Sequence, residues 1–232
     1  MNEQLLGAPR YSPAETSRLV GMNPARVRRW LRGYHYEWGA AEERNRGTKT
    51  PVICRHQDSD EPFASFLDLI ELRIINAFLD KGLTLHKIRL ALDEAGKLLQ
   101  ADHPFARRSF YTEGKEIYLF ASTGHRQGLL QLCSGGQWTI ANVVLTYARQ
   151  LDFSAITGFA ERWFPRGRTG GIVVDPTIAF GAPTIIGRRT KTWVVHDLYR
   201  AESRSAGRVA TLLGLTEEQV AAAVAFEEKL AA

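Results

Sequence analysis

The stretch YSPAETSRLVGMNPARVRRWLRG, residues 11–33, contains the start and stop signals of two short helices. The first has a serine cap, a proline at its first position, a glutamate for a capping box and a glycine stop: Ser12, Pro13, Glu15 and Gly21. The second has an asparagine cap, a proline and a glycine stop: Asn23, Pro24 and Gly33. Two capped helices joined by a glycine-containing turn predict a helix-turn-helix.

The second of these helices is predicted to be amphipathic. At about 100° per residue, its apolar residues Val27, Trp30 and Leu31 fall on one side. The opposite side holds four arginines: Arg26, Arg28, Arg29 and Arg32. Guanidinium groups pair with guanine edges and phosphates, so this side can dock in the major groove of DNA. A solvated helix face is the alternative, but such a face usually mixes charge signs, and this helix has no acidic residue.

The segment after these helices is polar and rich in turn residues, and it predicts a β-hairpin wing within residues 33–62. Residues 23–55 contain eight basic and three acidic residues, so the basic charge extends from the helix into the wing. We expect one aromatic and three basic residues of the wing to contact DNA: Tyr34, Arg44, Arg46 and Lys49. Helix-turn-helix proteins usually bind as two-fold dimers, so a homodimer is expected.

The sequence YSPAETSRLVG at residues 11–21, followed by VRRW at residues 27–30, is similar to the start of MerR-type winged helix-turn-helix regulators. The resemblance covers the N-terminal part of the chain. It implies a DNA-binding domain whose recognition helix contains residues 27–30. The Tyr-Arg-x-Tyr motif that usually ends the MerR wing is absent.

Length and composition exclude several classes of protein. The chain has 232 residues, 30 basic and 25 acidic residues, and 44% hydrophobic residues, which is enough to bury a core. No apolar run approaches the roughly 20 residues that a membrane helix needs, and the N-terminus lacks the pattern of a secretory signal. Two cysteines, Cys54 and Cys133, do not suffice for a disulfide framework or a structural zinc site, which fits a reducing cytoplasm.

Two longer helices are predicted in the middle of the chain, at residues 65–81 and 84–100. The apolar stripe of the first is so wide that it fits either a dimer surface or burial inside the monomer. Residues 110–120 and 129–140 have the pattern of β-hairpins, whereas residues 142–150 fit a strand or a helix.

The last segment follows residues 165–171, PRGRTGG, which are the best linker candidate. It predicts a small hairpin at residues 172–187 and three helices at about 192–201, 206–213 and 217–230. Thr216 and Gln219 form a capping box for the last helix. The apolar residues of that helix fit either a core or a partner surface: Val220, Ala223, Val224 and Leu230.

The sequences DPTIAFGAPTIIGRR at residues 175–189 and LTEEQVAAAVAFE at residues 215–227 are similar to family 433 of the domains of unknown function. Phe180 stands where that family has the first of two glycines. The resemblance implies a VapB-like antitoxin, of the kind commonly encoded beside a PIN-like ribonuclease toxin. With the MerR-like front, the layout looks like that of the long VapB-type antitoxins.

Three basic residues stand near the start of the first C-terminal helix: Arg188, Arg189 and Lys191. They are candidates for binding the toxin or a second stretch of DNA. By the analogy, an arginine could enter the carboxylate cluster with which PIN-like nucleases hold their metal. The alternative is that Arg189 pairs with Asp175 or Asp197 within the fold.

No nucleophile motif or P-loop occurs, and the six histidines lack metal-ligand spacing, so we expect no enzymatic activity, cofactor or metal site. The predicted fold class is α+β, mainly α. It comprises a winged helix-turn-helix at residues 1–62, a helical middle with β-hairpins at 63–165, and a C-terminal hairpin plus three helices at 166–232. The predicted function is a DNA-binding antitoxin that represses its own operon and neutralises a PIN-like ribonuclease. The alternative is a MerR-like regulator without a toxin partner.

Overall fold

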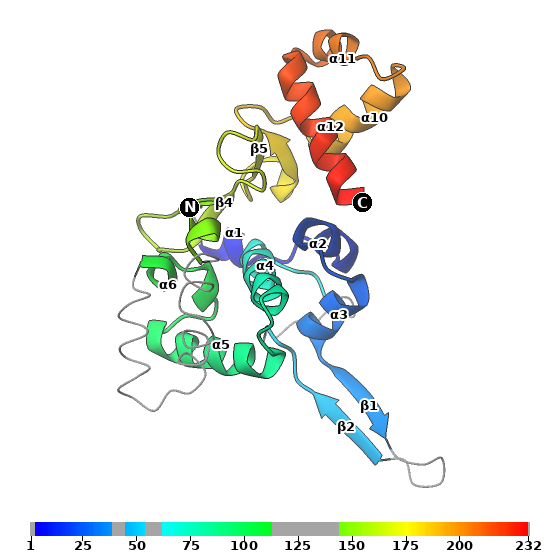
Figure 1. Ribbon diagram of the computed structural model, residues 1–232. Helices are drawn as coiled ribbons and strands as arrows, with labels where there is room; N and C mark the ends of the chain where they lie inside the picture. The colour runs from blue at the N-terminus through cyan, green and yellow to red at the C-terminus, as the bar shows by residue number, and fades with distance from the viewer. Residues whose placement is uncertain (1–2, 39–44, 54–61, 113–143, 232) are drawn as a thin grey trace.

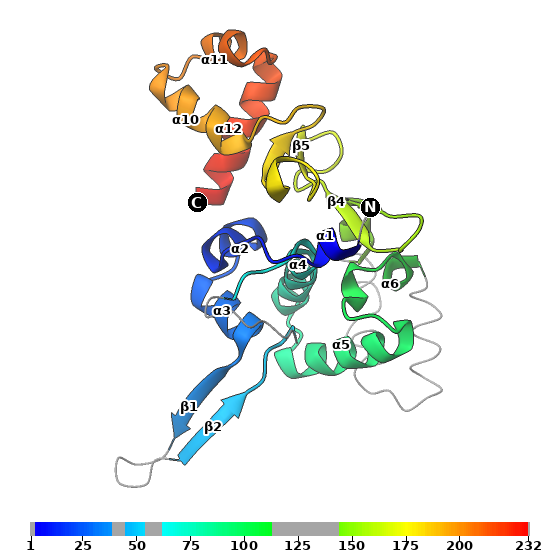
Figure 2. The same cartoon turned by 180° about the vertical axis from the view of Figure 1, so that it is seen from behind.

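The computed structural model describes four stretches of the chain: residues 3–38, 45–53, 62–112 and 144–231. Within them the fold is mixed, with many helices and two small antiparallel sheets. Figures 1 and 2 show an elongated molecule, in which a two-stranded ribbon projects at one end and three C-terminal helices lie at the other.

The N-terminal part contains the predicted helix-turn-helix. A short helix, α1 (Glu3–Gly7), precedes α2 (Pro13–Val20) and α3 (Pro24–Arg32). The predicted caps are formed, since the Ser12 hydroxyl accepts from the Glu15 amide at 3.2 Å and the Asn23 side chain accepts from the Ala25 amide at 2.9 Å. Gly21 ends α2 in the left-handed conformation, with φ +70°. These contacts satisfy backbone groups that a helix leaves unpaired at its ends.

The ribbon after α3 is the predicted hairpin wing. It consists of β1 (Tyr34–Trp38) and β2 (Asn45–Lys49), which pair antiparallel with Tyr34 opposite Lys49. The ribbon extends away from the helices (Figure 1). Candidate residue Arg44 and the cysteines Cys54 and Cys133 lie outside the described residues.

Two helices form the centre of the protein, α4 (Phe66–Asp80) and α5 (Leu85–Leu99). Their bounds agree with the prediction, and Ser65 caps α4 with a capping box. The apolar residues of α4 are buried almost all round the helix, from Phe66 to Phe78. Burial inside the monomer therefore explains the wide stripe, and the interpretation of this helix as a dimer surface is wrong.

Beyond α5, the structure corrects one predicted strand. Phe110 and Tyr111 belong to a helix, α6 (Arg108–Thr112), which follows the 3₁₀ turn η1 (Pro104–Ala106). The Phe105 and Phe110 rings lie 4.6 Å apart, and the Tyr111 hydroxyl donates to the Phe105 carbonyl at 2.8 Å. This aromatic packing outweighs the strand preference of the two residues. The remainder of the two predicted hairpins lies outside the described residues.

Residues 144–148 are helical, which agrees with the helix that was one of the two alternatives predicted for residues 142–150.

The second sheet has the order β3 (Leu151–Phe153), β4 (Ala160–Trp163), β5 (Ile172–Val174) and β6 (Pro183–Ile185). The predicted hairpin of residues 172–187 corresponds to β5 and β6. Residues 165–171 connect β4 to β5, which pair through Trp163 and Val174. The linker interpretation of this segment is therefore wrong, because it joins neighbouring strands of one sheet.

Three helices end the chain, α10 (Thr192–Ala201), α11 (Ala206–Leu213) and α12 (Glu217–Ala231), close to the predicted ranges. The Thr216–Gln219 capping box is formed, with reciprocal bonds of 3.0 and 3.2 Å. Val220, Ala223 and Val224 are buried, so these positions are core. Among the described residues no single helix is long and apolar enough to cross a membrane; α11 and α12 reach that length and composition only as a pair bent by 109°.

The two ends of the chain meet at a seam. The Tyr11 hydroxyl, which is buried, donates to the Gly181 carbonyl at 2.9 Å, and Arg10 donates to the Pro176 carbonyl at 3.2 Å. On the other side, the Arg18 guanidinium of α2 lies 2.9 Å from the buried Glu227 carboxylate of α12. The helix-turn-helix is thus held directly against the C-terminal part.

The buried Tyr11 hydroxyl in this seam should make the protein less stable at alkaline pH. Burial raises the pKa of Tyr11 well above its ordinary value, so the folded state holds the phenol proton more tightly than the unfolded state. The stability that the protonated, buried Tyr11 contributes is fully present below the pKa of about 10 that tyrosine has in the unfolded chain. It is lost as pH rises from there toward the higher pKa of Tyr11 in the folded protein. The free energy of unfolding should fall by about 1.4 kcal/mol per pH unit for each such tyrosine. Urea titrations between pH 8 and 11 measure it, and Tyr11→Phe should show a shallower decline. An equal decline in both proteins would refute the assignment to Tyr11.

Candidate nucleic-acid interface

The helix α3 has the predicted apolar and basic sides. Val27, Trp30 and Leu31 are buried in the core, whereas Arg26, Arg28, Arg29 and Arg32, here called the α3 arginines, are exposed. The Trp30 carbonyl accepts from the Val52 and Ile53 amides at 2.8 and 3.2 Å. These two bonds fix the end of α3 against the chain that returns from the wing, so the arginines are presented on a rigid helix.

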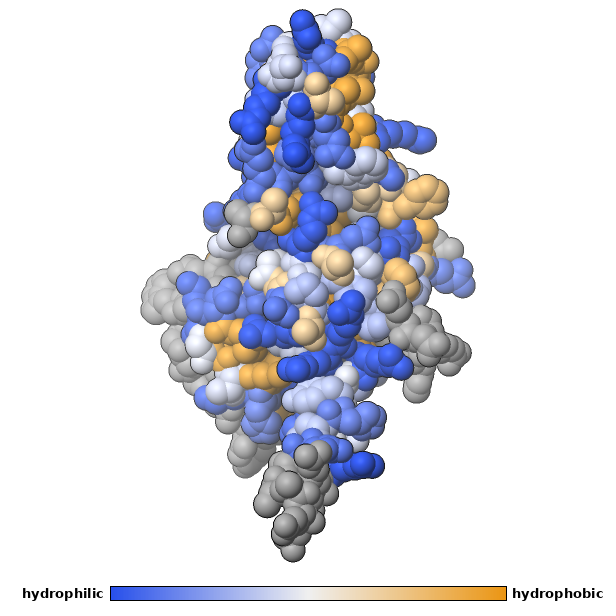
Figure 3. Space-filling model, turned by 90° about the vertical axis from the view of Figure 1, so that its right-hand side faces the viewer, coloured by the Kyte–Doolittle hydropathy of each residue, from blue (hydrophilic) through white to orange (hydrophobic). Residues whose placement is uncertain are grey.

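The α3 arginines are not equivalent in position. From the helical period, Arg29 and Arg32 lie nearest the line opposite the buried side chains, and Arg26 and Arg28 flank them. Figure 3 shows hydrophilic side chains gathered over the part of the surface where α3 and the wing lie. A convex basic helix of this kind fits a major groove.

One face of the wing continues the basic surface of α3. Tyr34 and Tyr36 lie two residues apart on β1, with their ring centroids 6.0 Å from each other. The Arg29 guanidinium lies 5.3 Å from the Tyr34 ring, and the Lys49 ammonium lies 5.9 Å from the Tyr36 ring. Cation–π contacts thus join helix and wing into one surface. Tyr36 was not among the predicted site residues, although its two-residue spacing from Tyr34 places both on one face of a strand.

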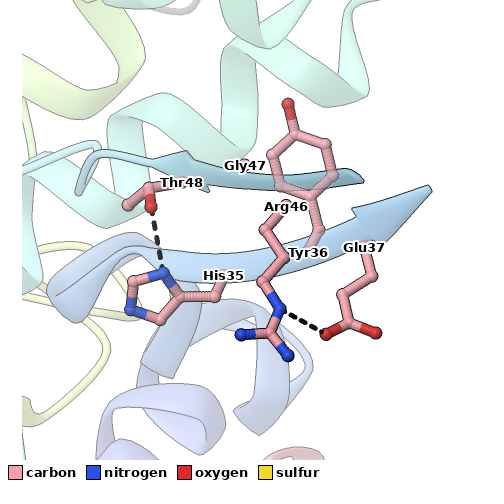
Figure 4. A pocket seen from close by; sticks show the side chains of 6 residues that line it. All are labelled: His35, Tyr36, Glu37, Arg46, Gly47 and Thr48. Carbon is pink, nitrogen blue, oxygen red and sulfur yellow. Dashed lines mark hydrogen bonds and ion pairs between the residues drawn. The ribbon is translucent and has the colours of Figure 1, made fainter. Parts of the chain in front are cut away.

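The opposite face of the wing carries a different set of side chains. His35, Glu37, Arg46 and Thr48 line a pocket there, together with Gly47 and Tyr36. Figure 4 shows the Tyr36 ring pointing away from the His35, Glu37 and Arg46 side chains. The Arg46 guanidinium lies 3.0 Å from the Glu37 carboxylate, so its charge is balanced by a surface ion pair. The structure therefore separates Arg46 from Tyr34 and Lys49.

Gly33 and Arg89 fix the base of the wing; the sequence predicted Gly33 only as a helix stop and gave no role to Arg89. Gly33 has φ +77°, and a Cβ at this position would overlap the Lys49 carbonyl oxygen, so glycine is required where the two strands meet α3. The Arg89 guanidinium of α5 donates to the Thr50 hydroxyl at 3.1 Å, the Thr50 carbonyl at 2.7 Å and the Pro51 carbonyl at 3.2 Å. Three bonds from one side chain hold the end of β2 against the body of the protein.

The second predicted group of cations lies far along the chain from α3. Arg188 and Arg189 are exposed in the turn between β6 and α10, and Lys191 is the residue that immediately precedes α10, where its side chain makes no capping bond. Asp175 accepts from the Arg162 Nε at 2.9 Å and from the Thr177 amide at 2.8 Å, and its hydrogen bond raises the pKa of Arg162. In the described part of the chain no ion pair joins Arg189 to Asp175 or Asp197, so the pairing considered from the sequence is not formed.

Comparison with known proteins adds two family matches and two relatives. Residues 9–92 match the family described as "Putative DNA-binding HTH domain", and residues 172–226 match "Protein of unknown function (DUF433)". The chain is 24% identical over 221 residues to "Putative antitoxin VapB45" of Mycobacterium tuberculosis (strain ATCC 25618 / H37Rv), covering 91% of each chain. It is also 24% identical to "Uncharacterized protein Rv2308" of the same organism, over 94% of this chain and 90% of that one.

A solved structure shares the fold. The crystal structure of Rv2018 from Mycobacterium tuberculosis matches with a TM-score of 0.68 and 22% sequence identity, over 94% of this chain and 97% of that chain. The chain thus contains a helix-turn-helix whose segment matches a family described as DNA-binding, followed by a segment that matches DUF433.

Proposed function

We propose that this protein is an antitoxin that binds the promoter of its own operon and neutralises a PIN-like ribonuclease toxin in the cytoplasm. The observation that carries the proposal is the surface formed by the α3 arginines, Tyr34, Tyr36 and Lys49, which is anchored by the buried side of α3. The N-terminal domain acts in it as a MerR-like winged helix-turn-helix. The predicted boundary between residues 62 and 63 remains part of this proposal. The predicted boundary between residues 165 and 166 does not, because it falls between the paired strands β4 and β5 of one sheet.

DNA binding follows from the chemistry of that surface. Arginine pairs bidentately with guanine edges in the major groove, and lysine and arginine neutralise phosphates. With α3 in the major groove, the wing face of Tyr34 and Lys49 would meet the adjacent backbone. A homodimer would place two such helices on half-sites about 34–36 Å apart, which predicts a two-fold symmetric operator.

The C-terminal part has the shape of a second helix-turn-helix but an unsuitable charge for DNA. Its helices α11 and α12 are joined by a three-residue turn with Gly214 in the left-handed conformation, and they meet at 109°. The exposed side of α12, however, bears three glutamates: Glu217, Glu218 and Glu228. Because carboxylates repel phosphates, this helix fits a protein partner better than DNA.

The toxin half of the proposal is supported by the relative named as an antitoxin, whose similarity extends over nearly the whole of both chains. Two experiments test the proposal. A gel shift with the DNA upstream of its own gene should show specific binding by the full chain. Co-expression with the product of the adjacent gene should yield a complex in which that product's ribonuclease activity is suppressed.

The alternative function, a MerR-like regulator without a toxin, uses the same DNA-binding surface. It predicts promoter binding but no complex with the adjacent gene product. Absence of promoter binding would contradict both functions, whereas absence of a complex would contradict only the antitoxin.

The anchoring of the wing gives a prediction for Arg89. Arg89→Gln removes the charge-assisted bonds to Thr50 and Pro51, each worth about 1.5–3 kcal/mol, and frees the wing to move. We expect promoter affinity to fall by roughly 3- to 30-fold. The freed wing must be ordered again when DNA binds, and the free-energy cost of that ordering weakens the complex. Fluorescence anisotropy with labelled promoter DNA measures the loss. Lys81→Gln, an exposed position with the same charge change, is the matched control, and equal affinities of the two variants would refute the role of Arg89.

A further inference from the structure

The loop between β5 and β6 holds an aromatic side chain in solvent on a strained backbone. Phe180 is 86% exposed and has φ +61°, and the preceding Ala179 has φ +50°. Positive φ is unfavourable for residues with a Cβ, and a bulky residue there is an outlier. Strained residues of this kind cluster at functional sites. An exposed phenyl ring contributes little to folding, so burial within the fold does not explain Phe180.

The surrounding structure fixes this conformation. Gly181 follows with φ +80°, its carbonyl accepts the buried Tyr11 hydroxyl at 2.9 Å, and a Cβ at Gly181 would overlap that hydroxyl. On the other side the Ile178 amide donates to the Asp175 carbonyl at 3.0 Å. Because both ends of the short 3₁₀ turn η2 (Ala179–Gly181) are bonded, Phe180 is presented at a defined place rather than on a loose loop.

Further apolar and basic side chains lie near this turn in the fold. A bridge between Thr184 and Lys191 and a 3.4 Å hydrogen bond from the Thr192 hydroxyl to the Pro183 carbonyl hold the start of α10 beside β6. Trp193, on that start, is 49% exposed, and Ile186 is also exposed. Arg188 and Arg189 project from the turn between them. Residues 176–195 contain three basic residues and no acidic one.

We propose that these five residues, Phe180, Ile186, Arg188, Arg189 and Trp193, form a docking surface for an acidic protein, with Phe180 as its apolar anchor. Interfaces obtain most of their binding energy from a few aromatic and arginine side chains, and a surface of single charge sign selects a partner of the opposite sign. The identity of that acidic protein as the toxin rests on the proposed function. These five residues are here called the Phe180 surface.

The chemistry of the Phe180 surface favours a protein over DNA as the occupant. Exposed phenyl and indole side chains match an apolar pocket on a protein, whereas the basic helix and wing already supply a surface for a duplex. The wing and the C-terminal helices lie at opposite ends of the molecule (Figures 1 and 2). A second copy of this chain is also less suitable, because a two-fold contact of the Phe180 surface with itself would place like charges together.

Because the backbone at Phe180 is strained, the role of its ring in binding can be tested without a loss of stability. Phe180→Gly removes the ring and relieves the backbone, so the variant should unfold at the same temperature as the parent protein or higher. It should nevertheless bind the adjacent gene product at least about tenfold more weakly, as expected for an anchor residue. Ile156→Ala, at an 88% exposed position in the turn between β3 and β4, is the matched control and should bind like the parent protein.

A second pair of variants tests the charge. Arg188→Glu should weaken the complex and make the remaining affinity less sensitive to salt, whereas Arg149→Glu, an exposed arginine of another segment, should not. Binding to the adjacent gene product is measured by surface plasmon resonance, with the unfolding temperature of each variant alongside.

The outcomes separate this proposal from the proposed function. A complex that forms equally well with Phe180→Gly and Arg188→Glu would overturn the Phe180 surface and leave the antitoxin function intact. A parent protein that does not bind the adjacent gene product would overturn both. Loss of promoter affinity in Arg188→Glu with an unchanged complex would assign the surface to DNA. A change of sedimentation coefficient in Phe180→Gly alone would assign it to a second copy, and either result overturns the proposal.

Discussion

Replacing the four α3 arginines together by glutamine should abolish specific promoter binding while the protein stays folded. Each direct contact of an arginine with a base or phosphate is worth about 1–3 kcal/mol, so loss of the set should lower affinity by on the order of 10³-fold or more. Folding should be unaffected, because all four side chains are exposed and the buried residues of α3 are unchanged. Fluorescence anisotropy with promoter DNA, and circular dichroism of the same sample, measure the two effects.

Arg149→Gln, which alters one exposed arginine outside the surface, is the matched control for the single variants of this set. It should bind the promoter like the parent protein. Within the set, the single variants Arg29→Gln and Arg32→Gln should have larger effects than Arg26→Gln or Arg28→Gln, because the former two lie nearest the centre of the exposed side. If the quadruple variant retains promoter binding, the basic side of α3 is a solvated helix face and not the DNA-binding surface.

Trp163→Ala should have the largest effect on stability. Trp163 is 2% exposed, pairs with Val174 across β4 and β5, and stacks on the Arg73 guanidinium of α4 at 4.5 Å. Its removal would leave a large cavity and expose that guanidinium, and should cost about 3–5 kcal/mol in the free energy of unfolding. Urea denaturation at neutral pH measures the loss.

The comparison with Trp193→Ala separates burial from residue type. Trp193 is half exposed, so the same substitution there should change the free energy of unfolding by less than about 1 kcal/mol. Equal losses at the two positions would show that the packing around Trp163 is not as described.

The sequence predicted the elements whose ends are set by local chemistry. Caps and stops such as Ser12, Asn23 and Gly33 act within a few residues of themselves, and the corresponding helices begin and end where expected. The amphipathic pattern of α3 likewise depends on its own residues. The three C-terminal helices follow for the same reason, since the capping box at Thr216 fixes where α12 begins.

Features that depend on distant contacts were not predictable in this way. The segment of residues 165–171 has the composition of a linker, and only the pairing of Trp163 with Val174 shows that it joins two strands. Phe110 prefers strands in isolation but packs on Phe105 in a helix. The partner of Arg46, the three bonds of Arg89 and the contact of Tyr11 with Gly181 all join residues that the sequence places apart.

The salt dependence of promoter binding tests the central claim most directly, since it counts the phosphates that the protein neutralises. With roughly four to eight phosphate contacts, the logarithm of the association constant should fall with the logarithm of salt concentration at a slope of about −4 to −7. The quadruple α3 variant should bind weakly with a shallower slope. Tight promoter binding whose association constant does not change with salt concentration would contradict DNA binding by the basic surface. The same holds if the slope of the salt dependence is unchanged by loss of the α3 arginines.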